Sequence, residues 1–258
     1  MTPLPVPSEV PASEPAVPTR PLSMQSAIPD TDALFRAILA DLPADADQRL
    51  IRATAVRHLG QARTDGNAAL AAAFRAEPRA ARKLVKAQSD LTDVLVQTAF
   101  DVVLRRIHPL ANPTESERVA VLAVGGYGRA EMAPFSDVDL LFLTPWKTTP
   151  WAESVVESLL YILWDLKLKV GHSTRTVKDC IRLGRDDITI RTALLEHRFL
   201  IGHEPLAKEL GDRLWADLFH NSGPEFIESK LQERAERHRR QGGQRYVLEP
   251  NVKEGKGG

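Results

Sequence analysis

Residues 119–143 contain two apolar runs, with three glycines between them and two aspartates at the start of the second run. The first run, residues 119–124, is short, rich in β-branched side chains and followed by glycine, which is typical of a strand buried on both faces. The second run starts at Asp137 and includes Asp139. Side chains alternate along a strand, so both carboxylates are expected on one face. Carboxylates this close repel each other unless a cation or solvent compensates them, which predicts a charged site beside a buried sheet.

The residue types in this stretch suit phosphate chemistry. Mg²⁺ prefers oxygen ligands, and one or two carboxylates with substrate phosphates form its usual protein site. Asp137 and Asp139 are therefore the predicted metal ligands and catalytic residues. Backbone N–H groups at Gly125, Gly126 and Gly128 could approach phosphate oxygens that a Cβ would block.

Two neighbouring polar residues complete the predicted nucleotide site. Arg129 could pair with a phosphate, and Ser136 lies directly before the aspartates. A helical turn is expected over residues 127–132. Each part has another interpretation. The glycines do not match the P-loop motif and could form a plain turn, and the aspartates could lie on a solvated edge strand or cap a turn. Together, the glycine turn and the aspartate pair favour a catalytic or once-catalytic site.

Composition limits the possible partners. The 258 residues are 43% hydrophobic, enough for one large domain or two small ones. Lys plus Arg equals Asp plus Glu, at 34 each, so a nucleic-acid partner is not favoured. The single cysteine, Cys180, excludes an intramolecular disulfide and is expected to be a small buried apolar residue. No apolar run approaches the roughly 18 residues needed to span a bilayer, so we expect a soluble, cytoplasmic protein without a membrane partner.

The fold class predicted for the chain is α+β, with a small mixed β-sheet flanked by N-terminal and C-terminal helices. Asp30 is expected to cap the first helix, and Pro78 to open a long one, while Gly60 and Gly66 interrupt the pattern between them. The expected helices cover residues 31–42, 45–59, 67–75, 78–102, 151–166, 177–183, 188–199, 205–219 and 224–240, and residues 167–175 form a third strand. The last helix is expected to be solvated. We divide the chain into a disordered proline-rich tail (1–29), a helical region (30–110), a catalytic core (111–185) and a second helical region (186–258).

The stretch GGYGRAEMAPFSDVDLLFL resembles the signature of the polymerase-β-like nucleotidyltransferase superfamily. More specifically, it resembles the bacterial PII-protein uridylyltransferases, the bifunctional uridylyltransferase and uridylyl-removing enzymes of nitrogen sensing. Two further stretches are similar in the same order: residues 163–176, LWDLKLKVGHSTRT, and residues 245–258, RYVLEPNVKEGKGG. The resemblance covers about residues 119–258 and is only loose before them.

This resemblance implies transfer of UMP from UTP to a tyrosine hydroxyl of the PII protein, with release of pyrophosphate and control by glutamine. It assigns the metal to the two aspartates and the triphosphate to the glycine turn. Related enzymes often carry a third carboxylate on a later strand, but residues 167–175 contain none. Asp165 is the nearest candidate, with His172 or Ser173 lining the cleft instead. Lys253 and Lys256 could reach the nucleotide or belong to a structural turn.

The family also carries an HD domain that removes UMP and ACT domains that bind glutamine. Neither is in these 258 residues, so we expect a fragment of a longer protein that holds only the transferase part. Two alternatives stay open. One is a glutamine synthetase adenylyltransferase or a similar protein-modifying enzyme, and the other is a module that senses a nucleotide without turning it over.

Overall fold

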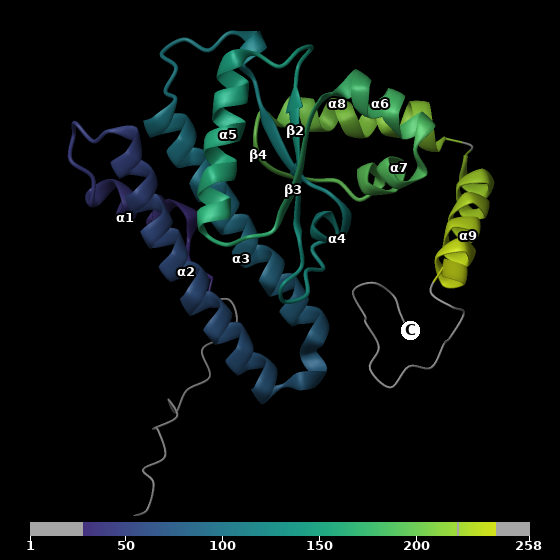
Figure 1. Cartoon of the computed structure of the whole chain (residues 1–258), viewed down its shortest axis with the longest axis horizontal. Coiled ribbons are helices and arrows are strands. Elements are labelled where there is room, and N and C mark those ends of the chain that lie inside the picture. Colours follow the sequence, from purple (N-terminus) through teal and green to yellow (C-terminus); the bar gives the residue numbers. More distant parts are fainter. Residues whose placement is uncertain (1–27, 221, 241–258) are drawn as a thin grey trace, which may run out of the picture.

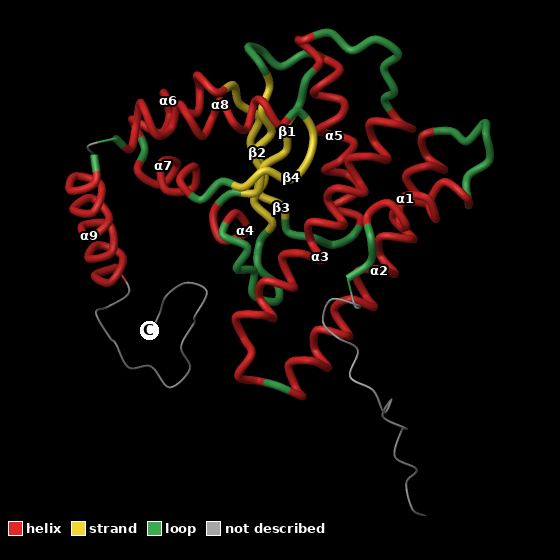
Figure 2. The backbone as a smooth tube through the Cα atoms, turned by 180° about the vertical axis from the view of Figure 1, so that it is seen from behind, coloured by secondary structure: helices red, strands yellow, loops and turns green. Residues whose placement is uncertain are grey.

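The computed structural model describes residues 28–220 and 222–240, in which a four-stranded sheet lies between two groups of helices (Figure 1). Figure 2 shows the same layers from behind. The strands are β1 (Ala120–Ala123), β2 (Val138–Thr144), β3 (Val170–Thr176) and β4 (Arg198–Gly202). The helices are α1 (Thr31–Ala40), α2 (Gln48–Ala76), α3 (Ala81–Val102), α4 (Gly125–Gly128), α5 (Pro150–Asp165), α6 (Val177–Asp186), α7 (Ile188–Leu195), α8 (Glu204–Leu214) and α9 (Gly223–Arg240).

The sheet has the strand order β3-β2-β1-β4 and is mixed, as the sequence predicts. β2 and β3 are parallel and are joined by the crossover helix α5, while β1 is antiparallel to both β2 and β4. The prediction of a helix through Phe199 is wrong, because α7 ends at Leu195 and β4 follows at once. The sheet therefore includes a strand beyond residue 185, the expected end of the core.

Both faces of β1 are covered, which confirms the prediction of a strand buried on both sides. Val121 and Ala123 belong to a hydrophobic cluster with α1, α2, α3 and α5. Ala120 and Leu122 point to the other face and belong to a cluster with α6, α7 and α8. These two clusters fix the sheet between its helical layers, so the ends of its strands are held in a rigid frame.

The N-terminal helices differ from the prediction in one respect. α2 is a single helix of 29 residues that continues through Gly60 and Gly66. A Cβ on the buried Gly66 would lie 2.7 Å from Leu91 Cδ2, so the glycine lets α3 approach closely. This contact offsets the cost of about 1 kcal/mol that a glycine imposes inside a helix. The other two signals are confirmed: Asp30 caps α1, and Pro78 opens the 3₁₀ turn that leads into α3.

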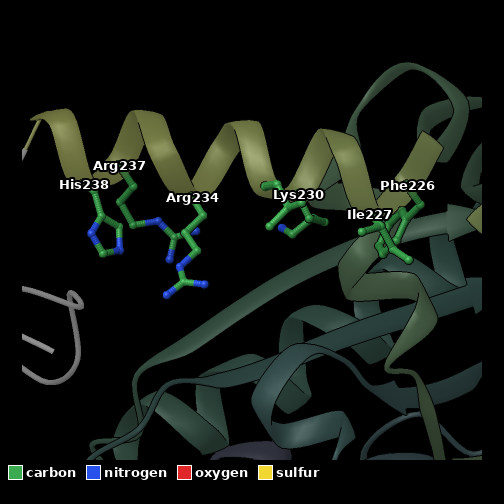
Figure 3. Close-up of a pocket in the computed structure, with 7 residues that line it drawn as sticks. Phe226, Ile227, Lys230, Arg234, Arg237 and His238 are labelled. Carbon is green, nitrogen blue, oxygen red and sulfur yellow. The ribbon is translucent and has the colours of Figure 1, made fainter. Parts of the chain in front are cut away.

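Helix α9 lies at the edge of the molecule, beyond α7 (Figure 1). None of its residues with a described environment is buried, which confirms the prediction of a solvated helix. An edge-to-face contact between Phe219 and Phe226, with ring centroids 6.2 Å apart, attaches its first turn to the preceding helical turn. Figure 3 shows Lys230, Arg234 and Arg237 along one side of α9, where they line a hollow of about 490 Å³.

Cys180 is buried in the cluster beneath α6, which confirms its prediction as a core residue. Burial raises the pKa of its thiol to about 12, so the reactive thiolate is almost absent at pH 8. We therefore expect the native protein to resist 5,5′-dithiobis(2-nitrobenzoate) at pH 8 and to release one equivalent of chromophore per chain in guanidinium chloride. Rapid reaction of the native protein would contradict this placement.

Within the described part of the chain, no helix combines the length and the apolar character needed to cross a membrane.

Candidate active site

The carboxylate of Asp139 lies between two glycines from different elements. Asp139 is the second residue of β2 and stands opposite Gly171 in the parallel pairing with β3. A Cβ on Gly171 would lie 2.4 Å from Asp139 Oδ1, and a Cβ on Gly125 would lie 3.6 Å from Oδ2. The carboxylate therefore occupies a gap that a side chain on β3 would fill. Sequence reasoning missed Gly171, although a lone glycine in a strand often marks a close approach.

Asp137 directly precedes β2, two residues before Asp139, at the position that strand alternation assigns to the same face. Both residues are half-buried. Further along this face, Leu141 and Leu143 are fully covered by the cluster under α6 and α8. The aspartate pair thus lies where the covered part of the face ends. Two carboxylates at the end of the covered face fit a Mg²⁺ ion whose other ligands are phosphate and water oxygens.

The helical turn α4 starts at the glycines, so the prediction of a turn over residues 127–132 is wrong by two residues at its start. Ala130, with φ 56°, is already outside the helix, in the left-handed region. Gly125 has φ +60°, a conformation that favours glycine. A Cβ on Gly128 would lie 1.7 Å from the carbonyl oxygen of Glu196, so the fold itself requires this glycine.

Gly126 has neither constraint. Its φ lies outside the left-handed region, and the nearest atom to an added Cβ is Arg129 Nη2 at an ordinary 3.7 Å. Packing of the described residues therefore does not explain this glycine, whereas a ligand approaching the backbone would. Gly125 and Gly128 are also explained by backbone conformation or packing, whereas the described residues give no such reason for Gly126. Its predicted role in nucleotide binding is therefore the easiest of the three to test separately from stability.

Arg129 forms ion pairs with two carboxylates of its own chain. Its Nη1 lies 2.6 Å from Glu196 Oε1, and its Nε lies 3.2 Å from Glu131 Oε2. A phosphate would have to compete with both carboxylates for the guanidinium group, so Arg129 is not available to a phosphate in this arrangement. The side chain instead links the end of the glycine turn to the end of α7.

A second arginine, Arg198 of β4, binds the backbone of the glycine turn. It forms a bidentate pair with Asp93 of α3, at 2.6 and 3.0 Å, and donates to the carbonyl oxygens of Tyr127 and Gly128, at 3.2 and 3.3 Å. Its guanidinium carbon also lies 5.5 Å from the centroid of the buried Tyr127 ring. Burial, and then the nearby charge of Asp93, raises the pKa of Tyr127 well above its ordinary value, so the ring stays neutral. Sequence reasoning missed this network because Asp93 and Arg198 are 105 residues apart.

Replacing Arg198 by alanine is expected to destabilise the protein by about 3 kcal/mol, because Asp93, only 16% exposed, would lose its charged partner. The free energy of urea unfolding, followed by circular dichroism, measures this cost. Arg52 provides the matched control, since it forms an exposed ion pair with Asp165 at 2.7 Å. Arg52→Ala should cost less than about 1 kcal/mol. Equal losses in the two variants would contradict a special role for Arg198.

The other predicted site residues are not gathered at the aspartates. Asp165, the candidate third carboxylate, ends α5 and pairs with Arg52 of α2. His172 is next to Gly171 and so points to the opposite face of β3, where its ring contacts Trp164 with centroids 6.3 Å apart. The expectation that His172 lines the aspartate cleft is therefore wrong, whereas Ser173 shares the face of the aspartates.

Two remaining predictions concern the third ligand and the terminal lysines. Within residues 28–220 and 222–240, no group of three or more His, Cys, Asp or Glu side chains is placed to hold a metal ion. The third carboxylate is thus missing from the described site. Ser136 lies in the loop before β2, where its backbone N–H donates to Ala133 O at 3.1 Å. Lys253 and Lys256 lie outside the described residues.

Comparison with known proteins gives a consistent result over most of the chain. A bifunctional uridylyltransferase/uridylyl-removing enzyme from Cereibacter sphaeroides is 68% identical over 236 residues, which is 91% of this chain and 25% of that protein. Proteins of the same name from Ruegeria pomeroyi and Rhodospirillum rubrum are 61% and 48% identical, over 89% and 90% of this chain and 25% of each relative. The chain belongs to the bifunctional uridylyltransferase/uridylyl-removing enzyme family. It spans about a quarter of the length of these relatives.

Two family models match different parts of the chain. The model described as GlnD PII-uridylyltransferase matches residues 225–258, and the model described as glutamate-ammonia ligase adenylyltransferase matches residues 18–162. The second match names the alternative left open by the sequence and includes the glycine turn and both aspartates. The uridylyltransferase relatives extend over both regions, so we take residues 18–162 as a part that the two families share.

Proposed function

We propose that this chain carries the site that transfers UMP from UTP to a tyrosine hydroxyl of the PII nitrogen-regulatory protein. In this reaction the tyrosine oxygen forms a bond to the α-phosphorus, the bond from that phosphorus to the bridging oxygen of the β-phosphate breaks, pyrophosphate leaves and the hydroxyl proton passes to water. The names of the relatives support the choice of reaction. The observation that carries the proposal is the Asp139 carboxylate between two glycines, with Asp137 two residues earlier.

We assign Mg²⁺ to Asp137 and Asp139. When bound, the ion would polarise the phosphate and neutralise charge that develops during transfer. The chain's own part is to hold the two carboxylates at the start of β2, an inner strand of the sheet, and to keep the glycine turn beside them. Gly126 is proposed to let the triphosphate approach the backbone, as the first N–H groups of a helical turn have no partner within it. A cytoplasmic location is part of the same proposal.

The test incubates the chain with Mg²⁺, purified PII and either α-labelled UTP or α-labelled ATP, and repeats both reactions with glutamine synthetase as acceptor. The Cereibacter sphaeroides relative serves as a positive control. We expect label from UTP on PII, and none when Mg²⁺ is replaced by excess EDTA. Label from ATP on glutamine synthetase would instead select the adenylyltransferase, the family that the match over residues 18–162 names.

If no label is transferred, a second measurement is needed. The relatives are about four times as long as this chain, and transfer could depend on their additional residues. Binding of a non-hydrolysable UTP analogue, followed by calorimetry with and without Mg²⁺, tests the site itself. Metal-dependent binding by the wild-type chain and loss of binding in Asp139→Asn would support the proposed site. Binding that neither Mg²⁺ nor this substitution affects would overturn it.

A further inference from the structure

A cavity of about 690 Å³ lies on the side of the molecule formed by the α2–α3 hairpin. Its other walls are the loop of residues 132–136 with Val138, and residues 167–169. The volume lies in the range of small-molecule sites. Most of the lining is apolar, and Leu70, Leu84 and Leu91 of the cavity belong to a small hydrophobic cluster of their own.

The charge of the cavity is one-sided. Four of its lining residues are cationic, namely Arg63, Arg75, Lys167 and Lys169, and none of the lining residues is Asp or Glu. The whole chain, in contrast, carries equal numbers of basic and acidic residues, 34 each. Three of these residues, Arg75, Lys167 and Lys169, are exposed, so their positive potential extends into the solvent at the cavity and attracts anions there. The lining therefore combines a surface for an apolar body with a preference for negative charge.

The mouth of the cavity exposes two aromatic rings. Phe135 is 91% exposed and has φ +66°, and Phe74 is 52% exposed. A bulky residue with positive φ is strained, and a ring left in water recovers little of that cost. A ligand that covers both rings would recover it by removing apolar surface from water.

We propose that this cavity binds a small amphipathic anion, with its apolar chain along the leucines and its carboxylate or sulfate group near the cationic side chains of the lining. The inference is independent of the proposed nucleotidyl transfer, because it uses the α2–α3 hairpin and the opposite side of β2. Strand alternation directs Val138 into this cavity and Asp139 to the other face. Ser136 and Val138, both in the lining, flank Asp137, so the cavity and the aspartate pair share one loop.

The test compares two probes with the same tail and opposite charge. Dodecanoate and dodecyltrimethylammonium are titrated into the protein by isothermal calorimetry at low ionic strength, below their critical micelle concentrations. We expect one dodecanoate per chain, bound at least tenfold more tightly than the cation. Equal affinities, or many molecules bound per chain without saturation, would overturn the proposal.

Two variants locate the binding. Arg75→Glu with Lys169→Glu should weaken dodecanoate binding at least tenfold, and Ala71→Trp, which adds an indole at an exposed position in the lining, should weaken binding of both probes. The matched control is Lys178→Glu with Lys208→Glu, two exposed lysines outside the cavity, which should leave binding within twofold. Circular dichroism confirms that each variant is folded.

Two outcomes would contradict a separate anion site in this cavity. One is an effect of the control pair equal to that of the cavity pair. The other is displacement of dodecanoate by UTP with Mg²⁺, which would make the cavity part of the nucleotide site rather than a site of its own.

Discussion

Asp139→Asn is expected to lower UMP transfer by more than about 1,000-fold, because the neutral amide cannot replace a carboxylate in holding a divalent ion. The folded state should not suffer, since removing one charge from a close carboxylate pair relieves repulsion. Incorporation of label from UTP into PII measures the first effect, and the midpoint of urea unfolding measures the second. Asp137→Asn should behave in the same way.

Asp165→Asn is the matched control for these substitutions. It makes the same chemical change at a carboxylate that pairs with Arg52 at the end of α5. We expect transfer within about twofold of the wild type and a stability loss below about 1 kcal/mol, because the pair is exposed. Loss of transfer in Asp165→Asn would restore this residue as the missing third carboxylate, and full activity in Asp139→Asn would refute the metal assignment.

Gly171→Ala tests the gap in which the Asp139 carboxylate lies. The new methyl group would come within 2.4 Å of Asp139 Oδ1, so the carboxylate must turn away while the strand stays paired. Transfer should therefore fall with little change in unfolding. Full activity would indicate that the position of the carboxylate in this gap is not needed.

Gly128→Ala is expected to destabilise the fold by more than about 4 kcal/mol, a large share of the 5–15 kcal/mol that holds a typical domain together. The added Cβ would lie 1.7 Å from the carbonyl oxygen of Glu196 and 3.0 Å from that of Ala123. Both are backbone atoms, since Ala123 ends β1 and Glu196 lies between α7 and β4, so neither can move without disturbing the sheet. The urea midpoint and the yield of folded protein report the loss.

Gly126→Ala is the partner experiment, two residues away in the same turn. Its Cβ would meet only the end of the flexible Arg129 side chain, at 3.7 Å. We expect wild-type stability and weaker binding of the UTP analogue. If both variants unfold alike, packing explains the two glycines equally, and if Gly126→Ala binds normally, the turn does not contact the triphosphate as proposed.

The local patterns of the sequence predict the centre of this fold well. The alternation around Asp139 and the apolar run of β1 can be predicted from residues that are adjacent in the sequence. The mixed sheet follows from the order of strands and helices. The continuity of α2 through Gly66 could not be predicted in this way, because it depends on Leu91 of another helix. β4 was missed for a related reason: its short sequence is ambiguous until β1 offers an edge with which to pair.

In the site, too, local sequence signals predict some residues, and contacts between distant elements explain the others. The aspartates and glycines carry a local signal, whereas the residues that support them, Asp93, Arg198 and Gly171, act through contacts between elements distant in sequence. His172 was placed in the cleft because its strand is polar, although its side-chain parity relative to Gly171 directs it to the other face.

The attachment of the glycine loop to α3 has a practical consequence for dividing the protein. Ser89 Oγ accepts the N–H of Met132 at 3.1 Å, and Asp93, one helical turn later, holds Arg198 beneath the glycine turn. A piece starting near residue 111, the border expected between the helical region and the core, would therefore carry every proposed metal ligand but lack the side chains that hold their loop in place. The smallest excised segment that keeps this site in its present shape must begin upstream of α3.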